Sequence, residues 1–145
     1  MKKLLLLSAL LIFACSFGQT KEEYFENAVD KYEAKDYYGA IRDFNKVIEF
    51  GEYANAYKNR GFSKYYIKDY NGAISDYTKV IELELNASQG EITTSLNREL
   101  ILLAYSARCI AKYLAKDLSG ACEDAKKSKS LGYDKASGLI EILCK

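Results

Sequence analysis

The chain has 145 residues, about the size of one domain. Hydrophobic residues make up 49% of it and charged residues 28%, a balance that is typical of a globular protein and excludes general disorder. Its 21 basic and 20 acidic residues form no long run of one sign, so neither nucleic acid nor a basic membrane-surface helix is expected; the lack of histidine excludes imidazole metal sites and the usual Ser-His or Cys-His nucleophile pairs.

Residues 1–18 have the pattern of an export signal. Lys2 and Lys3 give a charged start, and the apolar run that follows is too short to span a bilayer as a stable helix. Cleavage after Gly18, cleavage before a lipidated Cys15 in a lipobox-like segment, and an uncleaved anchor are all open. The pattern predicts an exported protein, periplasmic or secreted or an outer-membrane lipoprotein, whose membrane contact is the leader or a lipid on Cys15.

Three segments of sixteen residues align without gaps, at 31–46, 64–79 and 112–127. Eight of the sixteen positions are identical in all three. In each segment a Lys-Asp pair ends one helical pattern, and a Gly-Ala pair follows near the start of the next. An internal repeat of this kind indicates stacked helix pairs that bury a continuous core together.

The periodicity predicts an all-α fold in one domain, 19–145: a right-handed α-solenoid of three antiparallel helix pairs plus a C-terminal capping helix. An irregular polar stretch is expected at 86–94. The repeats and the end helix are predicted at about 21–51, 53–85, 95–132 and 134–144.

Short polar residues predict where the helices begin. Thr20 and Glu23 have the spacing of a capping box for the first helix. The Asp of each Lys-Asp pair is expected to cap the second helix of its repeat, and Asp134 to cap the end helix. The three repeated caps are Asp36, Asp69 and Asp117.

Small and aromatic residues stand at fixed places in the second repeat, 54–85. They are Tyr57, Gly61, Ala73, Tyr77 and the pair Val80 and Ile81. This pattern resembles the tetratricopeptide repeat, although the proline that often ends the unit is missing and the third repeat matches less well. The resemblance extends over nearly all of 19–145 and implies a non-catalytic module that binds another protein or a peptide, without a cofactor or metal.

The resemblance also implies that the first helices of successive pairs line a concave peptide groove. Its predicted residues are Phe25, Val29, Tyr32, Asn55, Lys58, Phe62, Tyr65, Tyr66, Ser106, Ile110 and Tyr113. The spacing of Phe25, Val29 and Tyr32 places them on one helix face. The alternative is that these rings only pack between repeats. Repeats that clamp the carboxylate tails of chaperones present a set of Lys and Asn residues in this groove. Phe25, Val29 and Phe62 replace much of that set here, and only Lys58 and Asn59 remain, so the groove is expected to be aromatic and mixed.

Acidic residues that recur in every unit predict structural ion pairs, because a catalytic pair would be unique. They are Asp43, Asp76 and Asp124. Each is expected to bind a cation of the preceding helix, for example Asp76 with Arg60 or Lys64. Glu91 and Glu99 are the loose candidates for an enzymatic alternative.

Four cysteines occur, and Cys15 belongs to the leader. Cys109 stands at the small-residue position of its repeat and is expected to be a buried core thiol. In an oxidising compartment, Cys122 and Cys144 are expected either to form a disulfide between the end helix and the last pair or to remain as free buried thiols. The absence of a Cys-x-x-Cys motif excludes the usual zinc and redox motifs.

These features favour a protein-protein interaction module of the cell envelope that binds an unknown peptide or protein in an aromatic groove. The alternative is a lipid-anchored structural subunit of an outer-membrane complex that uses its convex faces for assembly. Lipidation of Cys15 distinguishes the two.

Overall fold

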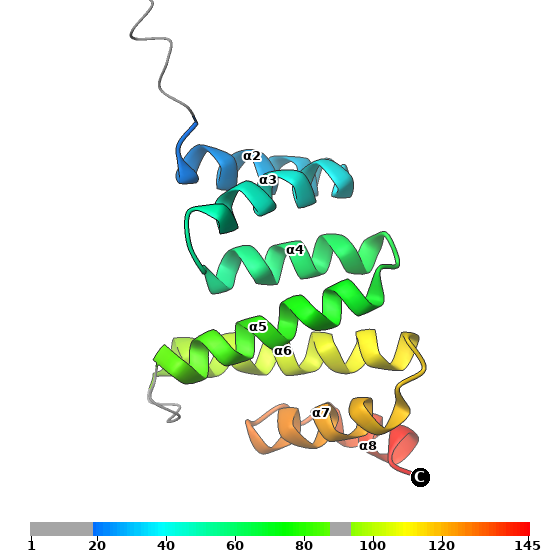
Figure 1. Cartoon of the computed structure of the whole chain (residues 1–145). Helices are drawn as coiled ribbons and strands as arrows, with labels where there is room; N and C mark the ends of the chain where they lie inside the picture. Colours follow the sequence, from blue (N-terminus) through cyan, green and yellow to red (C-terminus); the bar gives the residue numbers. More distant parts are fainter. Residues whose placement is uncertain (1–18, 88–93) are drawn as a thin grey trace, which may run out of the picture.

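The computed structural model describes residues 19–87 and 94–145, and its regular secondary structure there is helical throughout. The helices are α2 (Lys21–Glu33), α3 (Tyr37–Glu49), α4 (Ala54–Tyr66), α5 (Tyr70–Ala87), α6 (Ser95–Leu114), α7 (Leu118–Ser130) and α8 (Ala136–Leu143). Each packs against the next, and the pairs stack along one axis (Figure 1). The predicted all-α solenoid of three pairs and an end helix is confirmed. The predicted leader with Cys15, and Glu91, lie outside the described residues.

The turn inside each helix pair is built in the same way three times. The Lys of each Lys-Asp pair has a positive φ, of 63°, 66° and 71° in chain order. The following Asp accepts a hydrogen bond of 2.9 Å from the backbone N–H three residues on, which confirms the caps predicted at Asp36, Asp69 and Asp117. That third residue is glycine in every repeat because a Cβ there would come within 2.0–2.2 Å of the capping carboxylate.

The two outer helix starts differ in how well the sequence predicted them. The capping box of Thr20 and Glu23 is present, with each side chain accepting from the other residue's backbone N–H. The cap predicted at Asp134 is wrong, because α8 begins only at Ala136 and has no side-chain cap. Successive i+3 backbone hydrogen bonds, including that from Ser137 N–H to the Asp134 carbonyl, bring the chain into the helix instead.

Small residues allow the helices of each pair to approach closely. Cys109 and Gly61 occupy equivalent positions and are buried, as predicted for the Cys109 thiol, whose pKa is raised by burial. A Cβ on Gly61 would lie 2.8 Å from the ring of Tyr77, which is itself 1% exposed. The close packing of α4 on α5 therefore depends on a residue with no side chain at this point.

A bidentate arginine joins the first and second repeats. Arg60 on α4 donates from Nε and Nη2 to the two carboxylate oxygens of Asp76 on α5, at 2.9 and 2.6 Å. Its Nη1 donates to Oδ1 of Asn45 on α3, at 2.6 Å. Lys64 lies 2.9 Å from the same carboxylate, so the predicted pairing of Asp76 is confirmed for both cations. Asp76 is only 2% exposed, so its charge is compensated almost entirely by these groups.

The second and third repeats are joined by the same arrangement. Arg108 on α6 donates to both carboxylate oxygens of Asp124 on α7, at 2.8 and 2.7 Å, and to the hydroxyl of Thr78 on α5, at 2.8 Å. Lys112 lies 3.0 Å from Asp124. We call these two contacts, centred on Arg60 and Arg108, the arginine bridges. Each bridge links three helices, two of its own pair and one of the preceding pair.

The ends of the array each lack one part of a bridge. Asn27 occupies the position of the bridging arginines in the first repeat, where Asp43 pairs with Lys31 at 2.5 Å. In the third repeat, Lys126 occupies the position of the acceptor Thr78. Among the described helices, each bridge thus forms between one repeat and the next, and the first and third repeats differ from this pattern at Asn27 and Lys126.

Replacing Arg60 by Met is expected to lower the free energy of unfolding by about 3 kcal/mol, because it leaves a buried carboxylate with Lys64 as its remaining ion-pair partner. Urea denaturation followed by circular dichroism measures the change. Arg42→Met on the exposed part of α3 is the matched control, with an expected change within about 0.5 kcal/mol. Equal losses in the two variants would contradict a structural role for the Arg60 bridge.

Replacing Gly61 by Ala is expected to destabilise the protein by about 1–3 kcal/mol, because the new methyl group meets the buried Tyr77 ring. The control is Gly138→Ala in α8, where a Cβ meets nothing within 4 Å and the better helix propensity of Ala should be neutral or stabilising. Thermal unfolding of both variants gives the comparison. A stabilising Gly61→Ala change would show that α4 and α5 are not closely packed here.

Candidate functional site

Three adjoining hollows form a groove beside the first helices of the pairs. The N-terminal hollow, between α2 and α4, has a volume of about 470 Å³. The central and C-terminal hollows, between α4 and α6, have volumes of about 300 and 370 Å³. Asn55 and Glu84 line both of the first two, and Glu99 and Leu103 line both of the last two, so neighbouring hollows adjoin one another. We refer to the three hollows together as the groove.

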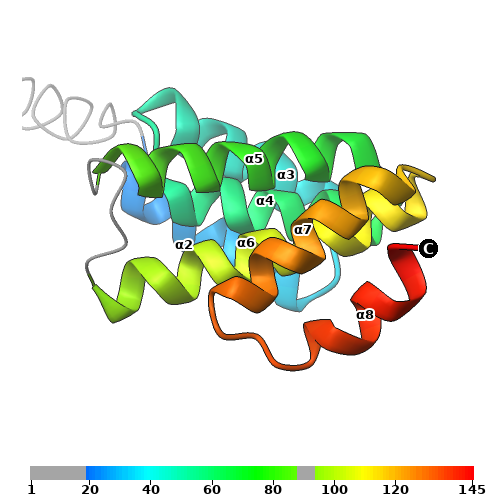
Figure 2. The same ribbon diagram turned by 90° about the horizontal axis from the view of Figure 1, so that it is seen from below.

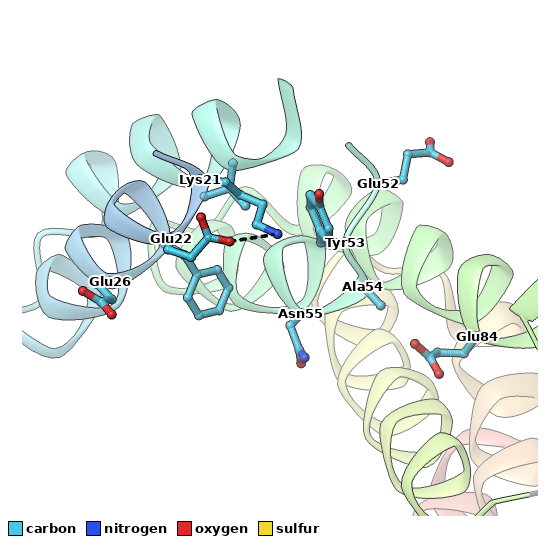
Figure 3. Close-up of a pocket in the computed structure, with 10 residues that line it drawn as sticks. Lys21, Glu22, Glu26, Glu52, Tyr53, Ala54, Asn55 and Glu84 are labelled. Atoms are coloured by element: carbon cyan, nitrogen blue, oxygen red, sulfur yellow. Dashed lines mark ion pairs between the residues drawn. The ribbon is translucent and has the colours of Figure 1, made fainter. Parts of the chain in front are cut away.

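Charged side chains surround the N-terminal hollow (Figure 3). The Lys21 ammonium lies 3.1 Å from the Glu22 carboxylate and 4.2 Å from the centre of the Tyr53 ring. Glu26 and Glu84 lie at opposite sides of this hollow in the close-up. The surface here presents carboxylates from two different repeats.

The C-terminal hollow is largely apolar. It is lined by Phe62 on α4, by Leu102, Leu103 and Ile110 on α6, and by Tyr133, which lies between α7 and α8. Leu103 is 38% exposed and Ile110 is 43% exposed. These side chains are large and apolar, and they are left uncovered within a concave surface, which is typical of a binding site.

A row of exposed apolar residues extends along α6, the longest helix. Leu96, Leu103 and Ile110 follow one another at intervals of seven residues, which places them on the same helix face. Leu96, in the central hollow, is 75% exposed. The row therefore continues the apolar surface from the C-terminal hollow into the central one.

The predicted groove residues are divided by the structure into two groups. Those that line the groove are Phe25, Asn55, Lys58, Phe62, Ser106 and Ile110. Val29 packs against the core of the first repeat instead. Tyr113 lines a separate hollow beside Cys122 and Cys144, away from the groove.

The remaining three predicted residues, Tyr32, Tyr65 and Tyr66, pack with Tyr37 into a cluster of rings. Tyr66 stacks on Tyr37 at 4.7 Å between ring centres, and it lies edge-on to Tyr32 at 6.0 Å and to Tyr65 at 5.6 Å. Burial, together with the neighbouring Tyr66, raises the pKa of Tyr32 to about 12. These rings join the first and second repeats, which is the packing role that the sequence left as an alternative.

The sequence missed the apolar contribution of α6, notably Leu102, Leu103 and Leu96, and the contribution of Tyr133. The signal was present as a helix with more apolar residues than its contacts with α5 and α7 require. The predicted residue Ser106 does line the groove, but its hydroxyl donates to the Leu102 carbonyl, at 2.9 Å.

A disulfide holds the C-terminal end of the solenoid. Cys122 on α7 and Cys144, just after α8, are bonded, with their Cα atoms 5.2 Å apart. Figure 2 shows α8 alongside α7. Leu139, Ile140 and Leu143 pack against the buried cluster that includes Cys109. The end helix therefore covers the last pair by both apolar and covalent contacts.

Lys58 is the one predicted cation of the groove, and its amine donates to Oδ1 of Asn55 at 3.0 Å. Burial lowers its pKa. Glu99, from the enzymatic alternative, lies exposed at the junction of the central and C-terminal hollows. Within residues 19–87 and 94–145, no three His, Cys, Asp or Glu side chains are grouped so as to hold a metal ion. No helix in these same ranges is long and apolar enough to cross a membrane.

Comparison with known proteins rests on structure alone, since no protein-family model and no curated protein matches the chain. The N-terminal domain of stress-induced protein-1 from C. elegans is similar, with a TM-score of 0.73 and 20% identity over 86% of this chain and 94% of that domain. The Arabidopsis OM64 TPR domain has a TM-score of 0.66 and 20% identity over 85% of this chain and 93% of that one.

The first TPR domain of Spaghetti (RPAP3), bound to the HSP90 peptide SRMEEVD, is also similar. Its TM-score is 0.68 and its identity 19%, over 88% of this chain and 93% of that chain. The Arabidopsis and Spaghetti structures are described as TPR domains, and all three similar structures cover 85–88% of this chain. The chain therefore has the fold of a tetratricopeptide-repeat domain.

Proposed function

We propose that this chain is a non-catalytic interaction module that binds a peptide or a protein segment in the groove. The proposal rests on one observation: Leu96, Leu103 and Ile110 are exposed in a row along α6, where they line two adjoining hollows. Leaving such a surface in water costs free energy, at about 25 cal/mol per Å² of apolar area. A bound segment removes that cost by covering the apolar side chains, and it gains polar contacts at the rim.

The comparisons support this proposal. The Spaghetti domain, with the same fold, is described in complex with a peptide of HSP90. The second TPR domain of human RPAP3, with a TM-score of 0.65 and 19% identity, is described in complex with the HSP70 peptide SGPTIEEVD. Peptide binding is thus compatible with this arrangement of helices, and the groove of this chain offers a surface for it.

The repeated charges support a non-catalytic role. Asp76 and Asp124 are both engaged by an arginine and a lysine within hydrogen-bond or ion-pair distance. A carboxylate that is saturated in this way is a poor general base, because its proton acceptor sites are already occupied. The recurring acids therefore serve the contacts between helices.

We place the protein in the cell envelope, as a periplasmic, secreted or lipid-anchored form. The pattern of residues 1–18 supports export, and the Cys122–Cys144 disulfide supports an oxidising compartment, since such bonds are rare in the cytosol. A lipid on Cys15 would make the protein an anchored subunit of an outer-membrane complex, whereas cleavage after Gly18 would release it.

Removing large apolar side chains from the groove is expected to weaken partner binding. A photo-reactive amino acid at Leu96 should form a covalent adduct with the partner in intact cells, because Leu96 lies exposed in the central hollow. The double variant Leu103→Ser/Ile110→Ser should reduce this adduct at least about tenfold, since covering one large apolar side chain contributes about 1.5–3 kcal/mol. Blotting for the tagged protein measures the adduct.

Leu118→Ser is the matched control, since Leu118 is an apolar residue of similar exposure that lies outside the groove. It should leave the adduct unchanged. An adduct that survives in the double variant, with circular dichroism showing a folded protein, would exclude the groove as the binding site.

Metabolic labelling with a fatty acid distinguishes the two anchoring alternatives. If Cys15 is the lipidation site, the wild-type protein takes up label and Cys15→Ala does not. If the leader is cut after Gly18, neither form takes up label and the mature protein begins at Gln19. Cys109→Ala is the control, because a buried thiol should not affect labelling.

A further inference from the structure

We infer that the segment bound in the groove is cationic and apolar, with Lys or Arg residues next to one or more large apolar side chains. This inference rests on the proposed function, since it names the chemistry of the partner at the same site. The charged and the apolar side chains that line the three hollows support it.

Acidic residues outnumber basic residues around the groove. Five glutamates and two lysines line the three hollows: Glu22, Glu26, Glu52, Glu84 and Glu99, with Lys21 and Lys58. The whole chain, in contrast, has nearly equal numbers of acidic and basic residues. The groove is thus a local concentration of negative charge, which raises the local concentration of a cationic partner and excludes an anionic one.

Not all of these glutamates are compensated within the chain. Glu22 pairs with Lys21, and Glu52 pairs with Lys79 at 2.6 Å. No ion pair in the described part of the chain engages Glu26 or Glu99, and both side chains are exposed. These two carboxylates therefore offer full acceptor capacity to an incoming ammonium or guanidinium group.

The positions of Glu99 and Leu103 place charge and apolar surface together. Both residues line the central and the C-terminal hollows. A segment that buries an apolar side chain against Phe62, Leu103 and Ile110 thus has a carboxylate at the edge of the same contact. A cation beside the apolar anchor would pair with Glu99, whereas an acidic residue there would be repelled.

Lys58 offers little to an anionic ligand in comparison. Its amine donates to Asn55, and it shares the central hollow with Glu84 and Glu99. The last four residues of the peptide SRMEEVD in the Spaghetti complex are Glu, Glu, Val and Asp. Three of them are acidic, and the last also carries the terminal carboxylate. A peptide of that kind would bring like charges together in this groove. The groove therefore favours a ligand of the opposite sign to the one bound by that structurally similar domain.

Selection from a random peptide library displayed on phage tests the inference without assuming a partner. Peptides of about 16 residues, somewhat fewer than the 20 residues of α6, are selected on the purified protein. Their affinity for the protein is measured by fluorescence polarisation. The selected peptides should have a net positive charge and at least one large apolar residue. Their affinity should fall when the salt concentration is raised, because exposed charge pairs are screened.

Three variants connect that affinity with named residues. Glu26→Gln/Glu99→Gln should weaken binding about three- to tenfold, because it removes the two uncompensated carboxylates. Lys58→Met should strengthen binding, because it removes an opposing charge. Glu123→Gln/Glu141→Gln, two exposed acids of α7 and α8 outside the groove, is the matched control and should change nothing.

The outcomes separate this inference from the proposed function. Selected peptides that are acidic or uncharged, and that lose binding in Leu103→Ser/Ile110→Ser, would overturn the cationic ligand and leave the groove as the binding site. Unchanged affinity in Glu26→Gln/Glu99→Gln would overturn it as well. If no peptide is selected, or if the selected peptides bind Leu103→Ser/Ile110→Ser as well as wild type, both the inference and the proposed function are wrong.

Discussion

The arginine bridges are the contacts on which the arrangement of the repeats depends. A single helix pair cannot bury both of its apolar faces, so the pairs must stack, but apolar contacts alone allow neighbouring pairs to slide. Each bridge fixes one placement, because the planar guanidinium must meet both carboxylate oxygens of its own pair and a polar side chain of the preceding pair at once. Removing these charges from water is costly, so the net gain in stability from each bridge is smaller than its short contacts suggest.

The form of the groove follows from that register. The bridges hold α4 against α3 and α5, and α6 against α5 and α7, which leaves the other faces of the first helices toward the concave side. Where the first and second repeats meet, Tyr66 of α4 packs on Tyr32 of α2 and stacks on Tyr37 of α3. Between α4 and α6, no comparable cluster of rings is found among the described residues, and Leu103 and Ile110 remain exposed. The apolar part of the groove therefore lies toward the C-terminal half.

The disulfide and the end helix complete the structure at one end, and the absence of a bridging arginine completes it at the other. The end helix α8 covers the apolar face of the last pair with Leu139, Ile140 and Leu143. In the first described repeat, Asn27 occupies the position of the bridging arginine. A finite array of repeats needs such ends, because an unfinished face would present unpaired charge or apolar surface to other chains.

The sequence by itself determined the repeats, their helix pairs, the capping of each second helix by Asp, and the pairing of Asp76 with Arg60 and Lys64. These features follow from local rules, since a cap or a helix face depends on residues three or four positions apart, and the repetition itself shows which charges are structural. Only the tertiary structure decided which apolar residues face one another and which remain uncovered. Tyr32, Tyr65 and Leu103 all belong to apolar helix faces in the sequence, but whether such a face is closed by a ring or left open depends on the neighbouring repeat, at a separation that no local pattern records.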